Sequence, residues 1–169
     1  MNMKKFWALM LSLAMALSLA ACGGDSGSSD GDAANDAEGS GDKVVRIGVF
    51  EPATGDSGPG GKQEMLGMQY ANQETPTVDI GGETYTVELV YADNGSDSSK
   101  AITAASELVS KDVSLVLGSY GSGVSIAAGP TFDEAGLAAI GVTCTNPQVT
   151  AGNDDYFRTS FLDPVQRTV

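Results

Sequence analysis

Short apolar runs and longer amphipathic segments alternate along residues 43–169. The apolar runs are rich in β-branched residues or alternate apolar with polar positions, as strands do. They predict strands at residues 44–52, 81–93, 113–117, 136–147 and 156–164. In the second of these, Tyr85, Val87 and Leu89 fall on one face, whereas the third is almost continuously apolar, as in a buried parallel strand.

The segments between the strands have the periodicity of helices. Residues 61–74 predict a helix whose core face consists of Met65, Leu66, Met68 and Ala71. Residues 98–112 predict a second helix, which Asp97 or Ser98 can cap. Its apolar stripe is expected to consist of Ala101, Ile102, Ala105, Leu108 and Val109.

A third helix is expected around residues 124–128, and Pro130 should break or kink it. Strands that alternate with helices predict an α/β fold, with a mostly parallel sheet and helices on both faces. Open sheets of this kind bind their ligands at the carboxyl ends of the strands. The loops that follow the predicted strands are therefore the candidate site.

Two uncharged segments follow neighbouring predicted strands. The sequence GSYGSGVS, which starts at Gly118, offers hydroxyls and backbone N–H groups at a helix start, and these suit a carboxylate. The sequence VTCTNP, residues 142–147, offers carbonyls and two threonine hydroxyls, which suit an ammonium. Together they predict a site for a zwitterion without charged side chains. Each segment alone is equally compatible with an ordinary turn, and Ser122 with a helix cap.

Other chemistries fit the sequence less well. The glycine-rich residues 55–62 lack the spacing and the final Ser or Thr of a phosphate-binding loop. Ser122 lacks the flanking glycines of a nucleophile elbow, and the chain has no histidine to activate Ser122 or Cys144. No cluster of His, Cys and carboxylates has zinc-ligand spacing. The sequence thus predicts a protein that is not an enzyme and has no cofactor and no metal.

The charge of the chain is strongly negative, with a formal net value of −13 at pH 7. Nucleic-acid binding requires clustered Lys and Arg, so no nucleic-acid partner is expected. The two cysteines are Cys22 and Cys144. If Cys22 carries a lipid, Cys144 has no disulfide partner within this chain.

The N-terminal residues predict a secretory signal and a lipid attachment site. Lys4 and Lys5 precede an apolar run, residues 6–21, which is shorter than the ~20 residues of a membrane span. The run ends in LAAC, which resembles a lipobox, in which a signal peptidase cuts before the cysteine and Cys22 is acylated. We therefore expect residues 1–21 to be a signal peptide, and the mature protein to be anchored by lipid to the extracytoplasmic side of a cell membrane.

Residues 22–42 are expected to form a lipidated acidic tether. After Cys22 they contain only Gly, Ser, Asp, Ala, Asn and Glu. Such a composition cannot bury enough apolar surface to offset the entropy lost on ordering. The folded part of the chain is therefore predicted to begin at residue 43.

Four segments carry a resemblance to a known family. They are IGVFEPATGD, VELVYADNGSD, SLVLGSYGSGVSIAAGP and GVTCTNPQVT, one at each of the first four predicted strands. Together they resemble the N-terminal lobe of the type I periplasmic binding proteins of the Leu/Ile/Val-binding family. The resemblance implies that residues 43–169 are part of such a lobe. It also implies a protein that captures a branched-chain or other neutral amino acid, or a related amide, for an ABC permease.

The same resemblance implies a role for each site residue. The carboxylate of the ligand would lie on Ser122 and on the N–H groups around it, from Gly121 to Gly123. The ammonium would meet the Thr143 carbonyl and the Thr145 hydroxyl. Tyr120 would form a wall of the side-chain pocket.

The chain departs from the family pattern in its first loop, where Gly60 stands in place of an aromatic residue that some members have. The family fold also has a second α/β lobe, a hinge and an acidic residue for the ammonium, so we expect residues 43–169 to be a fragment that binds weakly by itself. Two other classes of protein remain open. One is a ligand-sensing receptor ectodomain of the same fold, and the other is an enzyme with catalytic groups in another part of the protein.

Overall fold

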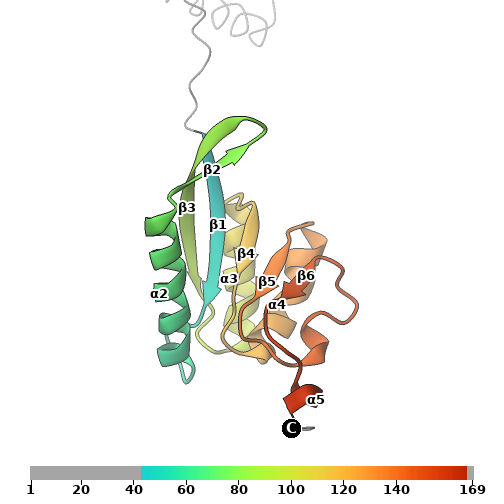
Figure 1. Ribbon diagram of the computed structural model, residues 1–169. Helices are drawn as coiled ribbons and strands as arrows, with labels where there is room; N and C mark the ends of the chain where they lie inside the picture. Colours follow the sequence, from blue (N-terminus) through green and yellow to red (C-terminus); the bar gives the residue numbers. More distant parts are fainter. Residues whose placement is uncertain (1–42, 167–169) are drawn as a thin grey trace, which may run out of the picture. The chain divides into compact units, whose positions relative to one another are not determined.

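The computed structural model describes residues 43–166 (Figure 1). The predicted signal peptide, Cys22 and the tether lie outside the described residues. Six strands form one sheet in the order β2-β3-β1-β4-β5-β6. They are β1 (Val44–Glu51), β2 (Thr77–Ile80), β3 (Glu83–Asp93), β4 (Leu115–Leu117), β5 (Ala139–Gly141) and β6 (Tyr156–Arg158). Only β2 and β3 pair antiparallel, which confirms the predicted mostly parallel sheet.

All five predicted strands are present, and β2 is an addition that the sequence analysis missed. It forms a hairpin with β3, in which Ile80 pairs with Glu83. The two residues between them, Gly81 and Gly82, have φ angles of 62° and 86°. A two-residue Gly-Gly turn of this kind is a known hairpin signal, because both positions need a left-handed backbone. The hairpin could therefore have been predicted from the sequence.

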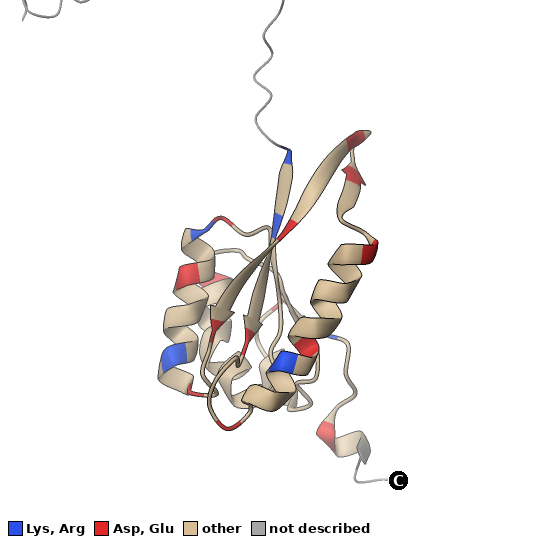
Figure 2. Cartoon of the chain, turned by 90° about the vertical axis from the view of Figure 1, so that its left-hand side faces the viewer, with Lys and Arg blue, Asp and Glu red and all other residues tan. Residues whose placement is uncertain are grey.

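Helices cover both faces of the sheet, as predicted. The helical segments are α2 (Gly58–Glu74), α3 (Ser98–Ser110), α4 (Ser122–Glu134), the 3₁₀ turn η1 (Pro147–Val149) and α5 (Asp163–Gln166). Helix α2 lies on one face, and α3 and α4 lie on the other (Figures 1 and 2). None of the helices within residues 43–166 has the length and apolarity that would let it cross a bilayer.

The main core lies between the sheet and the α3/α4 layer. Phe50 from β1 and Phe132 from α4 are fully buried and pack edge to face, with ring centroids 5.5 Å apart. Helix α3 buries four residues against this layer: Ala101, Ala104, Ala105 and Leu108. Ile102 was expected in this stripe but is 49% exposed, because the buried positions follow i, i+3, i+4 and i+7 and Ile102 lies outside that face.

The start of α3 and the course of α4 test two local predictions. Asp97 is the N-cap of α3, and its Oδ1 accepts from the backbone N of Ser99 and of Lys100, both at 2.9 Å. Pro130 was expected to break or kink the helix, and a break is wrong, because α4 continues through Pro130 to Glu134. Burial of Ala128 and Phe132, on either side of Pro130, stabilises the helix against the loss of one backbone hydrogen bond.

Helix α2 packs in a way that the sequence pattern did not predict. It begins at Gly58 rather than at residue 61, and its buried residues are Gly58 and Gly61. A Cβ atom at Gly61 would collide with the carbonyl oxygen of Pro52, so the backbone of α2 approaches the first loop closely. Leu66, predicted to face the core, is 64% exposed, and Ala71 is exposed as well. The predicted core face of this helix is therefore wrong in part.

Candidate ligand-binding site

The segments that the sequence analysis singled out meet at one edge of the sheet. Strand β4 pairs in parallel with β1 on one side and with β5 on the other, so the carboxyl ends of all three point the same way, toward the bottom of Figure 1. The turn from β4 into α4, the segment after β5 and the start of α2 all follow these ends. The parallel sheet thus brings them together, as predicted.

The turn after β4 is tight and depends on two glycines. Gly118 has a φ of 125°, and a Cβ atom there would collide with the carbonyl oxygen of Phe50. Gly121 has a φ of 116° and is the N-cap of α4. Between them, Ser119 is fully buried and accepts a hydrogen bond from Asn94 Nδ2 at 2.8 Å. The backbone of the turn is therefore fixed against β1 and the end of β3.

Ser122 links the turn to the segment after β5. It is the first residue of α4, and no side chain caps the helix, so the interpretation of Ser122 as a helix cap is wrong. Instead, Ser122 Oγ accepts a hydrogen bond from the backbone N of Asn146 at 3.2 Å. A hydroxyl that accepts in this way keeps its hydrogen for another acceptor. The backbone N–H groups of the first helical turn have no intrahelical acceptor and lie beside it.

The segment after β5 is held by a side chain that the sequence analysis missed. Arg158 Nη1 donates to the carbonyls of Cys144 at 3.2 Å and Asn146 at 3.0 Å, and Nη2 donates to Thr150 Oγ1 at 2.7 Å. The Thr145 carbonyl accepts from the backbone N of Asp163 at 3.0 Å. Several carbonyls predicted to face a ligand thus serve to shape the loop. The Thr143 carbonyl is not among these acceptors.

Tyr120 lies between the turn and α2. Its side chain is 42% exposed, and a Cβ atom at Gly60 would lie 2.6 Å from Cζ of the ring. The ring therefore lies directly on the backbone of α2 at Gly60. An aromatic side chain from the turn thus occupies the space that an aromatic side chain at position 60 would take, which gives a physical reason for glycine there.

Two acidic residues reach this edge, although the site was predicted to be free of charge. Glu51, the last residue of β1, is fully buried, and its Oε2 accepts from the backbone N of Tyr120 at 2.7 Å. Glu64 from α2 accepts from Thr143 Oγ1 at 2.6 Å. The two carboxyls lie beside each other, and the remaining oxygens, Glu51 Oε1 and Glu64 Oε2, are buried without an N–H or O–H donor among the described residues. Burial, followed by the contact with Glu64, raises the pKa of Glu51 to about 9, so Glu51 is protonated at neutral pH.

The burial of Glu51 could have been predicted from the sequence. In a strand, residues i and i+2 share a face, so Glu51 belongs with Val49 and Ile47. Val49 is buried and Ile47 is half-buried. An acidic residue at the end of such an apolar face predicts a buried carboxyl with a partner. The identity of the partner, Glu64, depends on the packing of α2.

The first loop is fixed by Asp93, at the carboxyl end of β3. Its Oδ1 accepts from the backbone N of Ala53 at 2.8 Å, and its Oδ2 accepts from Thr54 Oγ1 at 2.7 Å. Burial alone would raise the pKa of Asp93, but the hydrogen bonds from Thr54, Gly95 and Ala53 outweigh it and lower that pKa. The carboxylate therefore anchors the loop that leads into α2.

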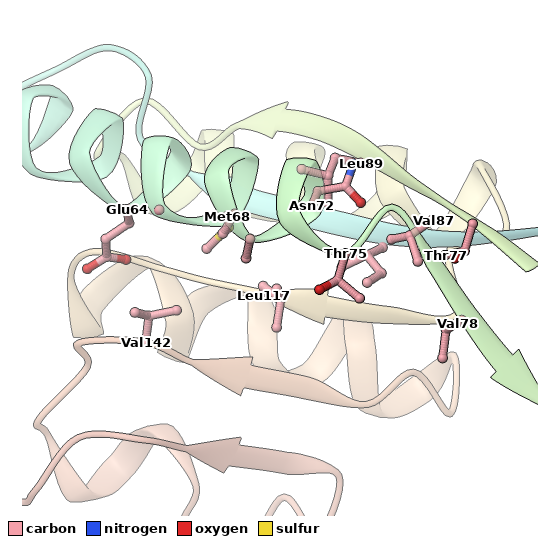
Figure 3. A pocket seen from close by; sticks show the side chains of 13 residues that line it. Glu64, Met68, Asn72, Thr75, Thr77, Val78, Val87, Leu89, Leu117 and Val142 are labelled. Atoms are coloured by element: carbon pink, nitrogen blue, oxygen red, sulfur yellow. The ribbon is translucent and has the colours of Figure 1, made fainter.

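A cavity of about 530 Å³ lies beside this edge, on the α2 face of the sheet (Figure 3). Side chains of Met68, Leu117 and Leu89 line it, and Glu64 and Val142 lie at one end. Its walls are largely apolar, and Ser122 is not among the lining residues. The cavity is thus distinct from the predicted carboxylate site, and Glu64, which lines it, also accepts from Thr143 Oγ1 in the segment after β5.

The described residues offer no metal site. Within residues 43–166, no group of three or more His, Cys, Asp or Glu side chains could hold a metal ion. Cys144 is buried with a free thiol, and Ser125 Oγ lies 3.6 Å from its sulfur. The chemistry of the site is therefore that of its hydroxyls, backbone N–H groups and the two carboxyls.

Residues 44–168 match the family described as periplasmic binding protein. The match covers most of the chain, so the chain belongs to this family, and its sheet and helices have the predicted type I periplasmic binding protein fold.

Three relatives illustrate the match. An "amino acid binding protein" of Pseudomonas aeruginosa is 36% identical over 128 residues, which is 74% of this chain and 34% of the relative. A leucine binding protein of Thermotoga maritima superimposes with a TM-score of 0.68 at 35% identity, over 73% of this chain and 34% of that one. A branched-chain amino acid transporter substrate binding protein of Streptococcus pneumoniae, solved with isoleucine, superimposes with a TM-score of 0.64 at 29% identity. The superposition covers 72% of this chain and 35% of that one. The chain thus spans about a third of the length of these relatives.

Proposed function

We propose that residues 43–169 are part of the N-terminal lobe of an extracytoplasmic substrate-binding lipoprotein that serves an ABC permease. The ligand would be a branched-chain or other neutral amino acid, or a related amide. Relatives named as amino acid and leucine binding proteins support this class of ligand. In this proposal a second lobe, outside the present sequence, closes over the ligand.

The hydrogen bond from Asn146 N to Ser122 Oγ is the observation that carries the proposal. It holds the two predicted ligand segments together and leaves the Ser122 hydroxyl hydrogen for the ligand. We assign the ligand carboxylate to this hydroxyl and to the N–H groups of Gly121, Ser122 and Gly123, at the positive end of α4.

The remaining groups complete the proposed site. The Thr143 carbonyl and the Thr145 hydroxyl would accept from the ammonium, and Tyr120 would bound the side-chain pocket. Thr145 is half-buried and Thr143 is exposed, so both hydroxyls lie at the surface of the edge rather than in the core.

Calorimetric titration of the natural full-length protein tests the proposal. Leucine, isoleucine, valine, alanine, short amides, nucleotides and simple sugars form the panel. We expect binding of one or more neutral amino acids or amides. Binding of only a nucleotide or a sugar would contradict the proposal.

The lipid anchor is a separate part of the proposal and rests on the LAAC sequence that ends at Cys22. Acylation of Cys22 would hold the protein at the membrane beside its permease, with residues 23–42 as the tether. Failure of this part would leave the proposed ligand site unchanged.

A further inference from the structure

Two carboxyls connect three parts of the proposed site, which are the turn after β4, helix α2 and the segment after β5. Glu51 Oε2 accepts from the backbone N of Tyr120 at 2.7 Å, and Glu64 Oε1 accepts from Thr143 Oγ1 at 2.6 Å. The other oxygens, Glu51 Oε1 and Glu64 Oε2, are buried and accept from no N–H or O–H donor of the described residues, and the two carboxyls lie beside each other. One chain of hydrogen bonds thus runs from the turn after β4, through α2, to the end of β5.

This contact requires a shared proton, because two ionised carboxylates have no donor between them. Glu51 is fully buried, whereas Glu64 is half-buried and has the Thr143 hydroxyl as an additional donor. Desolvation therefore places the shared proton on Glu51. Tyr156 from β6 also interacts electrostatically with Glu51, and burial raises the pKa of that phenol, which stays neutral.

The position of this proton determines which partner donates in the hydrogen bond between Glu64 and Thr143. A threonine hydroxyl has one hydrogen and two lone pairs, and here the hydrogen points to Glu64. Toward a ligand, the exposed Thr143 oxygen can then only accept. The negative charge of Glu64 lies one hydrogen bond behind it and favours a positive group in front.

We propose that Glu64 is a specificity-determining residue, which acts through Thr143 to select ligands with an N–H donor, above all an ammonium, at this end of the site. Glu51 is a positioning residue, whose buried carboxyl lies behind Glu64 and holds it toward Thr143. The inference rests on the proposed function, because it takes the segment after β5 as the place of the ligand amine.

Replacing Glu64 by Gln tests the inference, because it reverses the direction of the bond. The Gln oxygen can accept from Glu51, its amide nitrogen then donates to Thr143 Oγ1, and the Thr143 hydrogen turns toward the ligand. The natural full-length protein is titrated with leucine, isoleucine, valine and alanine and with the 2-oxo acid of each. A 2-oxo acid keeps the carboxylate and side chain but has an acceptor in place of the ammonium.

We expect Glu64→Gln to weaken binding of the amino acids by about tenfold to a hundredfold, the effect of one hydrogen bond to a charged group. Binding of the 2-oxo acids should stay unchanged or become tighter. The matched control is Glu74→Gln, which removes the same charge from an exposed position at the end of α2 and should change neither affinity by more than about twofold.

Two further variants keep the test decisive if Glu64→Gln does not fold. Thr143→Val removes the hydroxyl at an exposed position of similar shape and should reduce the preference for the amino acid as Glu64→Gln does. Glu51→Gln keeps an acceptor for Tyr120 N and a donor for Glu64, so it should preserve the preference. Retained preference in Thr143→Val, or its loss in Glu51→Gln, would overturn the inference.

The inference and the proposed function fail in different ways. Equal weakening of amino acids and 2-oxo acids by Glu64→Gln, or no change in either, would overturn the inference and leave the proposed function intact. A wild-type protein that binds no neutral amino acid and no amide, or that binds the 2-oxo acids more tightly than the amino acids, would overturn both.

Discussion

Replacing Glu51 by Gln should remove a pH dependence of folding stability. The pKa of Glu51 rises from 4.5 in its ordinary state to about 9 in the folded protein, mainly because of burial and then because of Glu64. Between these values the folded state holds a proton that the unfolded state has lost. Stability of the wild type therefore falls as pH rises through this window, and it levels off above about pH 9, where the proton is lost from both states.

The expected slope follows from the proton count. One bound proton changes the free energy of unfolding by about 1.4 kcal/mol per pH unit, so the wild type loses about 3 kcal/mol between pH 5 and pH 7 through this group. The Gln side chain of the variant is uncharged at every pH, so this position contributes no dependence of stability on pH. The chain has no histidine, so no imidazole within it titrates in this window.

Urea unfolding of the wild-type and Glu51→Gln full-length proteins at pH 5, 6, 7 and 8 measures the effect. We expect the free energy of unfolding of the variant to rise relative to that of the wild type by about 1.4 kcal/mol per pH unit. Glu74→Gln, an exposed position on α2, serves as the control and should give a constant difference. A constant difference for Glu51→Gln as well would show that Glu51 is ionised when folded and would refute the assignment of the shared proton.

Three other predictions concern the proposed site and the membrane anchor. Ser122→Ala should weaken amino acid binding by about tenfold to a hundredfold with a small change in melting temperature, and calorimetry that finds unchanged affinity would contradict the assignment of the carboxylate. Gly60→Ala should displace the exposed Tyr120 ring and change affinity, whereas Gly67→Ala, with open space around the new Cβ, should only stabilise α2 by about 0.5–1 kcal/mol. Titration and thermal melting of both variants distinguish these outcomes. Mass spectrometry of membrane-associated protein should show a chain that starts at acylated Cys22, and an unmodified chain that retains residues 1–21 would exclude the lipid anchor.

Local pattern predicted most of the elements and the place of the candidate site. The periodicity of residues 98–112 was enough to find α3, and Asp97 was named as one of two possible caps. Alternating strands and helices require parallel connections, which bring the carboxyl ends of β1, β4 and β5 to one edge. The sequence pattern therefore predicts Ser122 and Thr143 at the same edge.

Where the sequence pattern failed, neighbours from other elements decided the outcome. Leu66 has the spacing of a core residue, but α2 approaches the first loop through Gly58 and Gly61 and leaves Leu66 exposed. Pro130 was expected to break or kink its helix, yet α4 continues through it to Glu134, where the residues on either side of Pro130 are packed in the core.

The sequence by itself determined the order of the elements, the sheet edge and the hydroxyl-rich chemistry there, because these depend on residues close together in the chain. Only the tertiary structure decided that Glu51 and Glu64 meet, that Arg158 shapes the segment after β5, and that Thr143 turns its hydroxyl toward a carboxylate. The physical reason is that the protonation of a carboxyl depends on the exclusion of water and on the partner brought to it. Both come from the packing of α2 against the end of β1.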